Sequence, residues 1–182
     1  WGSFDPQSSI TIDKIPGAMQ IQALAARLFG YNQWTVLGPQ VVEAGIAIVG
    51  MFAIVRRWTG PRAGLIAAAA FATMPVVAAL AHAEIGDMAL TMFLVLAAYC
   101  WTRAVQATRV VDGDTVPSAG TGWLLLAGVV VGLACQTKMV QAWGVLPAFG
   151  LSYLLFAGGT WLKRSINLVL ATLVTAAVSL WW

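Results

Sequence analysis

The sequence has 182 residues, of which 60% are hydrophobic and only 9% are charged, and its mean hydropathy is +0.82. Because soluble domains contain about 25% charged residues, this composition excludes a water-soluble globular domain. A membrane-spanning helix needs about 20 mostly apolar residues, and the long uncharged stretches have room for several. Glycine and proline are scattered through apolar runs without strict alternation of apolar and polar residues, which favours helices over barrel strands. The net charge of +3 is explained by basic cytoplasmic loops and implies no nucleic-acid partner.

The order of polar and apolar stretches predicts an all-α, polytopic transmembrane helix bundle. Residues 1–34 are expected to form an outer loop and a short amphipathic helix, over 18–29, that lies along the membrane interface. Residues 35–182 are expected to form the bundle, with about six spans. These spans are predicted at 35–55, 63–81, 88–104, 122–137, 139–157 and 165–182. Because the chain starts and ends abruptly with Trp residues, without a signal sequence, we expect a piece of a larger protein.

Basic residues predict the orientation of the spans, because they are concentrated in every second loop. The positive-inside rule assigns these loops to the cytoplasm. They contain Arg56, Arg57, Arg62, Arg103, Arg109, Lys163 and Arg164. The first polar loop and the loop between the second and third spans then lie on the outer, extracytoplasmic side.

Cysteines and most tryptophans are interpreted as structural residues. Cys100 and Cys135 lie inside apolar runs without metal-type spacing, so both are predicted to be free thiols in the core. Tryptophans mainly lie near the ends of the predicted spans, where indole rings anchor helices at the lipid headgroups. These are Trp34, Trp58, Trp101, Trp123, Trp143, Trp161, Trp181 and Trp182.

Asp13 and Lys14 form the first candidate site on the outer side. The carboxylate can accept a proton and the ammonium can bind an anionic phosphate. Pro16 disfavours helix in the residue before it, which could lift the pair away from the following helix. The alternative is a solvated ion pair on an exterior loop.

A second candidate cluster contains His82, Glu84 and Asp87. Asp87 is predicted to begin the third span, where the positive end of the helix dipole favours an ionised carboxylate; the alternative is a simple capping residue. Asp13, His82 and Glu84 could also hold a divalent metal ion. This is the weaker alternative to a site without metal, because a single histidine lacks the two-histidine spacing of common metal sites.

Two further charged residues lie next to or within apolar segments. Lys138 follows Gln136 and Thr137 at the outer boundary of the fourth span, and such a lysine either extends its ammonium to the interface or meets an anion. Glu43 lies deep in the first span and requires an interior partner or a proton. We interpret Glu43 as structural or as lining a path for lipid.

Four runs, in this order along the chain, carry a resemblance to a known family. They are SFDPQSSITIDKIPGAMQIQALAARLFGYNQW, RRWTGPRAGLIAAAAFATMPVVAALA, an acidic outer loop that ends in GDMAL, and GWLLLAGVVVGLACQTKMVQAWGVLPAF. Together they cover nearly the whole chain. The sequence resembles the bacterial polyprenyl-phosphate-sugar glycosyltransferases of the type C superfamily, with their dolichyl-phosphate-mannose-protein mannosyltransferase-like and aminoarabinose-transferase-like members.

The resemblance assigns roles to several residues. Asp13 and Lys14 match the family's acidic residue and lysine in the first outer loop, although one of the family's two prolines is missing there. Asp87 matches the aspartate that begins the helix after the second outer loop. Thr137 and Lys138 match a Thr-Lys pair that ends a glycine-rich span. His82-Ala83-Glu84 replaces an Arg- or Asn-rich stretch of related sequences, so sugar or acceptor selection is expected to differ.

The resemblance implies an enzyme of the bacterial plasma membrane that moves a sugar from a polyprenyl-phosphate donor to an acceptor hydroxyl on the extracytoplasmic face. Its acceptor would be a protein, a lipid or a glycan. Asp13 and Asp87 are the candidate catalytic carboxylates, and the candidate substrate-binding residues are Lys14, His82, Glu84 and Lys138. A lipid or solute transporter, or flippase, and a noncatalytic membrane subunit remain the alternatives.

Overall fold

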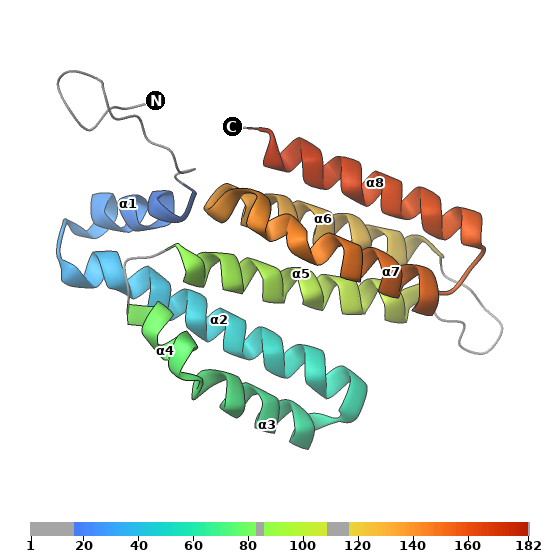
Figure 1. Cartoon of the computed structure of the whole chain (residues 1–182). Helices are drawn as coiled ribbons and strands as arrows, with labels where there is room; N and C mark the ends of the chain where they lie inside the picture. The colour runs from blue at the N-terminus through green and yellow to red at the C-terminus, as the bar shows by residue number, and fades with distance from the viewer. Residues whose placement is uncertain (1–16, 83–85, 109–116, 182) are drawn as a thin grey trace.

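The computed structural model describes residues 17–82, 86–108 and 117–181, and within these ranges the chain is helical, with no strand (Figure 1). The elements are α1 (Gly17–Phe29), α2 (Gln33–Thr59), α3 (Pro61–Ala72), α4 (Pro75–His82), α5 (Asp87–Thr108), α6 (Pro117–Lys138), the 3-10 helix η1 (Met139–Val145), α7 (Leu146–Phe156) and α8 (Trp161–Ser179). The predicted all-α bundle is therefore confirmed.

Among the described residues, four helices are long and apolar enough to cross a membrane: α2, α5, α6 over Gly120–Lys138, and α8. Helices α3 and α4 are bent by 58° and provide a fifth span if the pair crosses as one. The chain is thus part of a multi-pass membrane protein. The predicted span at 63–81 is broken because Pro75 lacks an N–H group and disfavours helix in the residue before it. The predicted span at 139–157 is not among these candidates, because it begins as the 3-10 helix η1 and its apolar helical part, Gln141–Phe156, is shorter than the four candidate spans.

Helix α1 confirms the short helix expected at 18–29, and local sequence explains its end. Gly30 has φ +81, a left-handed conformation that glycine adopts without steric cost. The side chain of Asn32 then caps α2 by accepting hydrogen bonds from the backbone N–H groups of Trp34 and Thr35. With 13 residues, α1 is too short to span a bilayer; its location at the membrane interface stays a prediction.

Helix α5 lies in the middle of the bundle, packed between α2 and α6, and α8 packs on the other side of α6 (Figure 1). Two glycines one helical turn apart, Gly128 and Gly132, let α6 and α8 approach closely. A Cβ atom on Gly132 would lie 2.6 Å from the Cβ atom of Val178. The Thr175 hydroxyl also donates a hydrogen bond of 3.1 Å to the carbonyl oxygen of Gly128. Small residues and interhelical hydrogen bonds of this kind hold membrane helices together.

An aromatic cluster joins α5 to α7. The Trp101 ring stacks on Phe149 with 5.1 Å between centroids, and meets Tyr153 edge-on at 5.3 Å. Trp101 is only 9% exposed, so its predicted place in an interfacial belt is wrong: its ring fills the space between two packed helices. Cys100 and Cys135 are buried free thiols, as predicted.

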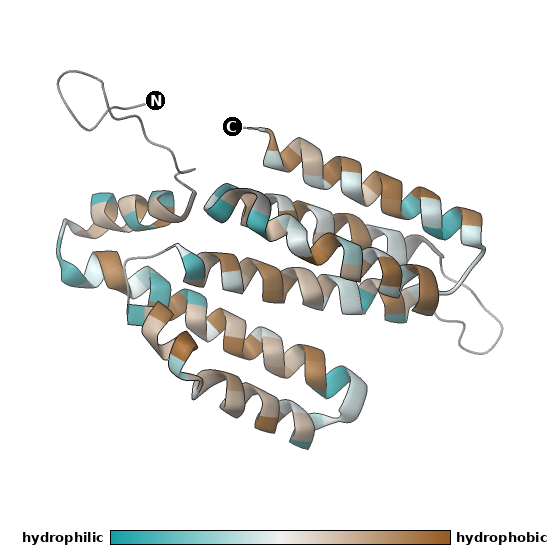
Figure 2. Ribbon diagram, viewed as in Figure 1, coloured by the Kyte–Doolittle hydropathy of each residue, from teal (hydrophilic) through white to brown (hydrophobic). Residues whose placement is uncertain are grey.

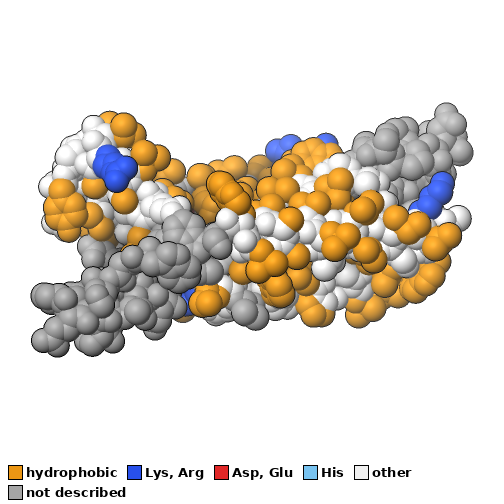
Figure 3. Space-filling model, turned by 90° about the horizontal axis from the view of Figure 1, so that it is seen from above, with side chains coloured by type: hydrophobic (Ala, Val, Ile, Leu, Met, Phe, Trp, Pro, Cys, Tyr) orange, Lys and Arg blue, Asp and Glu red, His pale blue; other side chains and the backbone are white. Residues whose placement is uncertain are grey.

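The two ends of the bundle differ in charge. Hydrophilic residues lie mostly near the helix ends, while the middle sections are apolar (Figure 2). In the view of Figure 3, hydrophobic side chains cover most of the described surface and basic ones show at only a few places. At one end, Arg57 and Arg103 both donate hydrogen bonds to the Tyr99 hydroxyl, at 3.4 and 3.3 Å. Lys163 and Arg164 lie near the start of α8 at this same basic end, whereas Asp87 begins α5 at the opposite end (Figure 1).

Candidate active site

An ion pair between Asp87 and Lys138 lies at the end of the bundle opposite the basic end. Asp87 is the first residue of α5 and Lys138 is the last residue of α6, so antiparallel packing of two neighbouring helices brings them together. Their side chains are 26% and 41% exposed, respectively. Both charged groups are therefore held in place while staying accessible to a ligand.

The backbone changes direction directly after Lys138. Met139 has φ +50 and is the only non-glycine residue with positive φ in the described part of the chain. A left-handed conformation costs a residue with a Cβ atom about 1–2 kcal/mol, and such strain is often found at functional sites. This turn ends α6 and leaves the ammonium of Lys138 at the helix end, facing Asp87.

A cavity of about 570 Å³ lies near the pair, between α1, α5, α6 and Trp181, the second residue after the end of α8. Thr137, the neighbour of Lys138 in the sequence, contributes to its wall. The remaining lining is mostly apolar with two amide side chains, and consists of Gly17, Gln20, Ile21, Leu24, Phe93, Leu133, Gln136 and Trp181. Such a space can accept an apolar chain; Asp87 and Lys138 do not line it themselves, and Thr137 links its wall to Lys138.

The start of α1 packs against Gly86, the residue before α5, and against Gln136 near the end of α6. A Cβ atom on Gly86 would lie 2.7 Å from the Cβ atom of Ala18, and a Cβ atom on Gly17 would collide with the carbonyl group of Gln136. The close approach of three chain segments therefore depends on glycine at positions 17 and 86. It brings the beginning of α1 into contact with Gly86, the residue before Asp87, and with the end of α6.

The C-terminal end of α8 is attached to the same region by hydrogen bonds that sequence reasoning missed. The Gln136 amide donates to the carbonyl oxygens of Val178 and Ser179, at 3.0 and 2.9 Å. The Trp143 indole N–H donates to the Ser179 hydroxyl at 3.2 Å. No local sequence signal joins residues about 40 positions apart, so only the tertiary structure could reveal that these groups support the cavity.

The other sequence-predicted site residues have different outcomes. His82 ends α4, is exposed, and its Nδ1 lies 2.8 Å from the carbonyl oxygen of Ala78 in its own helix. Asp13, Lys14 and Glu84 lie outside the described residues. In the part of the chain that the structure describes, no group of three metal-binding side chains is present. The alternative metal site, which needs Asp13 and Glu84, stays a prediction.

A larger apolar cavity of about 710 Å³ lies between α1 and α2. Glu43 contributes to its wall and is only 6% exposed. Gln40, one helical turn earlier and 2% exposed, has no hydrogen-bond partner for its amide among the described residues. Glu43 therefore lines an apolar space near the candidate site, and its proposed contact with lipid stays a prediction.

Comparison with known proteins gives the family. Residues 13–182 match the model of the dolichyl-phosphate-mannose-protein mannosyltransferase family. The whole chain is 36% identical to the Bacillus subtilis protein named "Putative mannosyltransferase YkcB" and 33% identical to "Putative mannosyltransferase YycA" of the same organism. It covers 24% and 25% of their lengths, so it spans about a quarter of these relatives. No solved structure matches. On this evidence, the chain belongs to the dolichyl-phosphate-mannose-protein mannosyltransferase family.

Proposed function

We propose that the protein containing this chain is a membrane glycosyltransferase that moves a sugar from a polyprenyl-phosphate donor to an acceptor hydroxyl on the extracytoplasmic face. The observation that carries the proposal is the Asp87–Lys138 ion pair beside a largely apolar cavity. Family membership supports a sugar transferase. The apolar cavity supports a donor whose sugar is attached to a lipid.

The reaction requires a base for the acceptor and positive charge for the leaving group. The acceptor oxygen attacks the anomeric carbon and its proton passes to a carboxylate, while the bond between the anomeric carbon and the phosphate oxygen breaks. The electron pair of that bond leaves with the polyprenyl phosphate, and the configuration at the anomeric carbon is inverted. The ammonium of Lys138 is placed to stabilise the leaving phosphate.

The two carboxylates then take different roles. We assign Asp13 as the base, because Asp87 is engaged with Lys138 and can hold that ammonium towards the phosphate. Asp13 precedes Gly17 by four residues, and four residues of chain reach at most about 14 Å. Because Gly17 packs against Gln136, this reach is compatible with a base close to the site. Lys14 would provide a second positive charge for the phosphate, and His82 and Glu84 would select the sugar or the acceptor.

The distribution of charge supports the proposed orientation of the site. Lys163 and Arg164 lie near the start of α8, and Arg56 and Arg57 lie in the last turn of α2, at the basic end of the bundle. The positive-inside rule assigns this end to the cytoplasm. The Asp87–Lys138 pair lies at the other end and would therefore face the extracytoplasmic side.

The test is sugar transfer from radiolabelled polyprenyl-phosphate donors in membranes that contain the full-length protein. Wild type is compared with Asp13→Asn and Asp87→Asn at matched protein levels and matched membrane insertion. A lost base lowers the rate about 10²–10⁴-fold, so Asp13→Asn should almost abolish transfer. Arg62→Asn, a change in an exposed residue at the opposite end of the bundle, serves as the control and should transfer normally.

Two results would contradict the proposal. Wild-type rates in both aspartate variants would separate these carboxylates from the chemistry. A wild-type protein that uses none of the donors, but moves intact lipid across liposome membranes, would identify a flippase instead.

A further inference from the structure

A third cavity lies at the basic end of the bundle, away from the candidate active site. Its volume is about 430 Å³. It lies where the end of α5, the start of α6, the end of α7 and the start of α8 meet. Among the described residues, its lining is rich in hydroxyl, amide and cationic groups and has no carboxylate: Thr108, Thr121, Tyr153, Gly158, Gly159, Thr160, Lys163, Arg164, Ile166 and Asn167.

The two cations occupy an electrostatically unfavourable position. Lys163 and Arg164 lie in the first turns of α8, and no acidic residue accompanies them in the first turn. The N-terminal end of a helix carries a partial positive charge, which favours anions and opposes cations. Among the described residues, the Asp87–Lys138 pair at the opposite end is the only ion pair. An anion bound between Lys163 and Arg164 would remove this repulsion.

Arg164 is held in place and retains hydrogen-bonding capacity. Its Nη1 donates a hydrogen bond of 2.7 Å to the carbonyl oxygen of Leu154, which ties the side chain to α7. Its Nε is buried and has no partner in the described part of the chain. The chain around the cavity is also fixed, since the backbone N–H of Gly158 donates to the Thr108 hydroxyl at 3.1 Å. A guanidinium held in this position in the wall of a cavity is suited to bind the oxygens of a phosphate.

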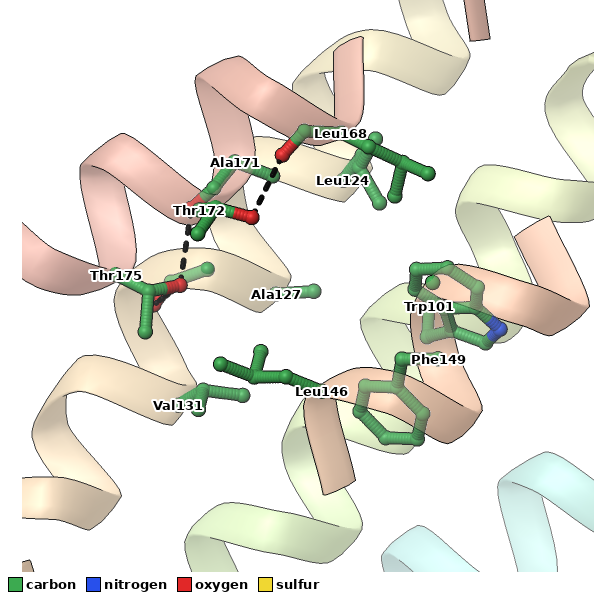
Figure 4. Close-up of a pocket in the computed structure, with 12 residues that line it drawn as sticks. Trp101, Leu124, Ala127, Val131, Leu146, Phe149, Leu168, Ala171, Thr172 and Thr175 are labelled. Carbon is green, nitrogen blue, oxygen red and sulfur yellow. Dashed lines mark hydrogen bonds between the residues drawn. The ribbon is translucent and has the colours of Figure 1, made fainter. Parts of the chain in front are cut away.

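A second, apolar cavity of about 170 Å³ lies one helical turn deeper along the same helices. Each of the four helices contributes to both cavities: Thr108 and Trp101 on α5, Thr121 and Leu124 on α6, Tyr153 and Phe149 on α7, and Asn167 and Leu168 on α8. Figure 4 shows Leu124, Leu146, Phe149 and Leu168 around this apolar space, with Trp101 beside Phe149. The polar cavity at the helix ends is thus followed, towards the middle of the bundle, by a small space suited to hydrocarbon.

We propose that the polar cavity binds the phosphate headgroup of an anionic glycerophospholipid, with Lys163 and Arg164 contacting the phosphate. The first methylene groups of an acyl chain enter towards the apolar cavity. This combination distinguishes a lipid from free phosphate, which has no apolar part. Basic pockets between membrane helices on the cytoplasmic side are suited to anionic lipid headgroups. The site is separate from the proposed transferase centre, which lies at the other end of α5 and α6.

The test titrates phosphatidylglycerol into the purified full-length protein and follows lipid adducts by native mass spectrometry. Each basic residue near an anionic headgroup contributes about 1 kcal/mol, so Lys163→Gln should weaken binding roughly fivefold and K163Q/R164Q about thirtyfold. Lys163→Gln leaves the hydrogen bond between Arg164 and Leu154 intact. The single variant therefore keeps the proposal testable even if the double variant misfolds. Lys163→Arg should bind like wild type.

The matched control is R56Q/R62Q. It removes two exposed positive charges from the same end of the bundle but outside the cavity, and should change the affinity less than twofold. Equal losses in both double variants would show general attraction to a basic surface and overturn the proposal. Unchanged affinity in K163Q/R164Q would overturn it as well. Complete displacement of the lipid by low millimolar inorganic phosphate would show a site for free phosphate instead.

Discussion

The carboxylate of Asp87 and the ammonium of Lys138 form an ion pair that joins the first residue of α5 to the last residue of α6. Partly exposed ion pairs contribute only about 0–1 kcal/mol to stability. The pair therefore contributes little to the stability of the bundle. Its main physical effect is to fix one anionic and one cationic group next to each other beside a cavity.

If Asp87 acts by positioning Lys138, then the two residues work as a unit. Asp87→Asn and Lys138→Gln should each lower sugar transfer by at least about 100-fold, and the double variant should be no more than a few-fold worse than either single variant. The measurement is the rate of transfer in membranes containing each full-length variant. Losses that multiply in the double variant would show that the two residues act independently. Asp87→Glu, which keeps the charge, should recover part of the activity.

Met139 provides a test of the strained turn after Lys138. Glycine adopts positive φ without steric cost, so Met139→Gly should raise stability by about 1 kcal/mol or leave it unchanged. A β-branched residue is especially disfavoured at positive φ, so Met139→Val should lower stability by about 1–2 kcal/mol and also reduce transfer by displacing Lys138. The measurement is the thermal unfolding midpoint in detergent together with the transfer rate. Stability should decrease from the glycine variant through the wild type to the valine variant. A valine variant as stable and active as the glycine variant would contradict it.

Gly132 provides a test of the contact between α6 and α8. Because a Cβ atom there would lie 2.6 Å from the Cβ atom of Val178, Gly132→Ala should separate the helices and cost about 1–3 kcal/mol. Gly122→Ala is the matched control in the same helix, since a Cβ atom on Gly122 meets nothing within 4 Å. The control should be neutral or more stable by about 0.5–1 kcal/mol. The comparison again uses unfolding midpoints in detergent, and equal midpoints for the two variants would contradict the packing argument.

Trp101 and Trp161 allow the stability cost of removing a buried tryptophan to be compared with that of removing an exposed one. Trp101 is 9% exposed between α5 and α7, while Trp161 at the start of α8 is 62% exposed. Trp101→Ala should cost about 3–5 kcal/mol because it leaves a cavity, whereas Trp161→Ala should cost less than about 1 kcal/mol. Thermal unfolding of the full-length protein measures both. A larger loss of stability in the Trp161 variant than in the Trp101 variant would contradict this prediction.

The sequence predicted the candidate site only in part. Asp87 and Lys138 could be singled out because charged residues at the ends of apolar segments are costly unless they meet a partner. Their pairing could not be read from positions 51 residues apart. The role of His82 stays a prediction: its side chain is exposed, and its Nδ1 lies 2.8 Å from the carbonyl oxygen of Ala78 in its own helix.

The sequence by itself determined the fold class, because apolar runs near bilayer length must form helices whose backbone groups bond internally in lipid. The positions of the arginines and lysines along the sequence likewise determined which end of the bundle is basic. Only the tertiary structure decided where helices break and which ones touch. The turn at Met139 and the contact of Gly132 with Val178 depend on sterics between distant segments. The cavity with Lys163 and Arg164 arises where four helices meet, and no local pattern encodes that meeting.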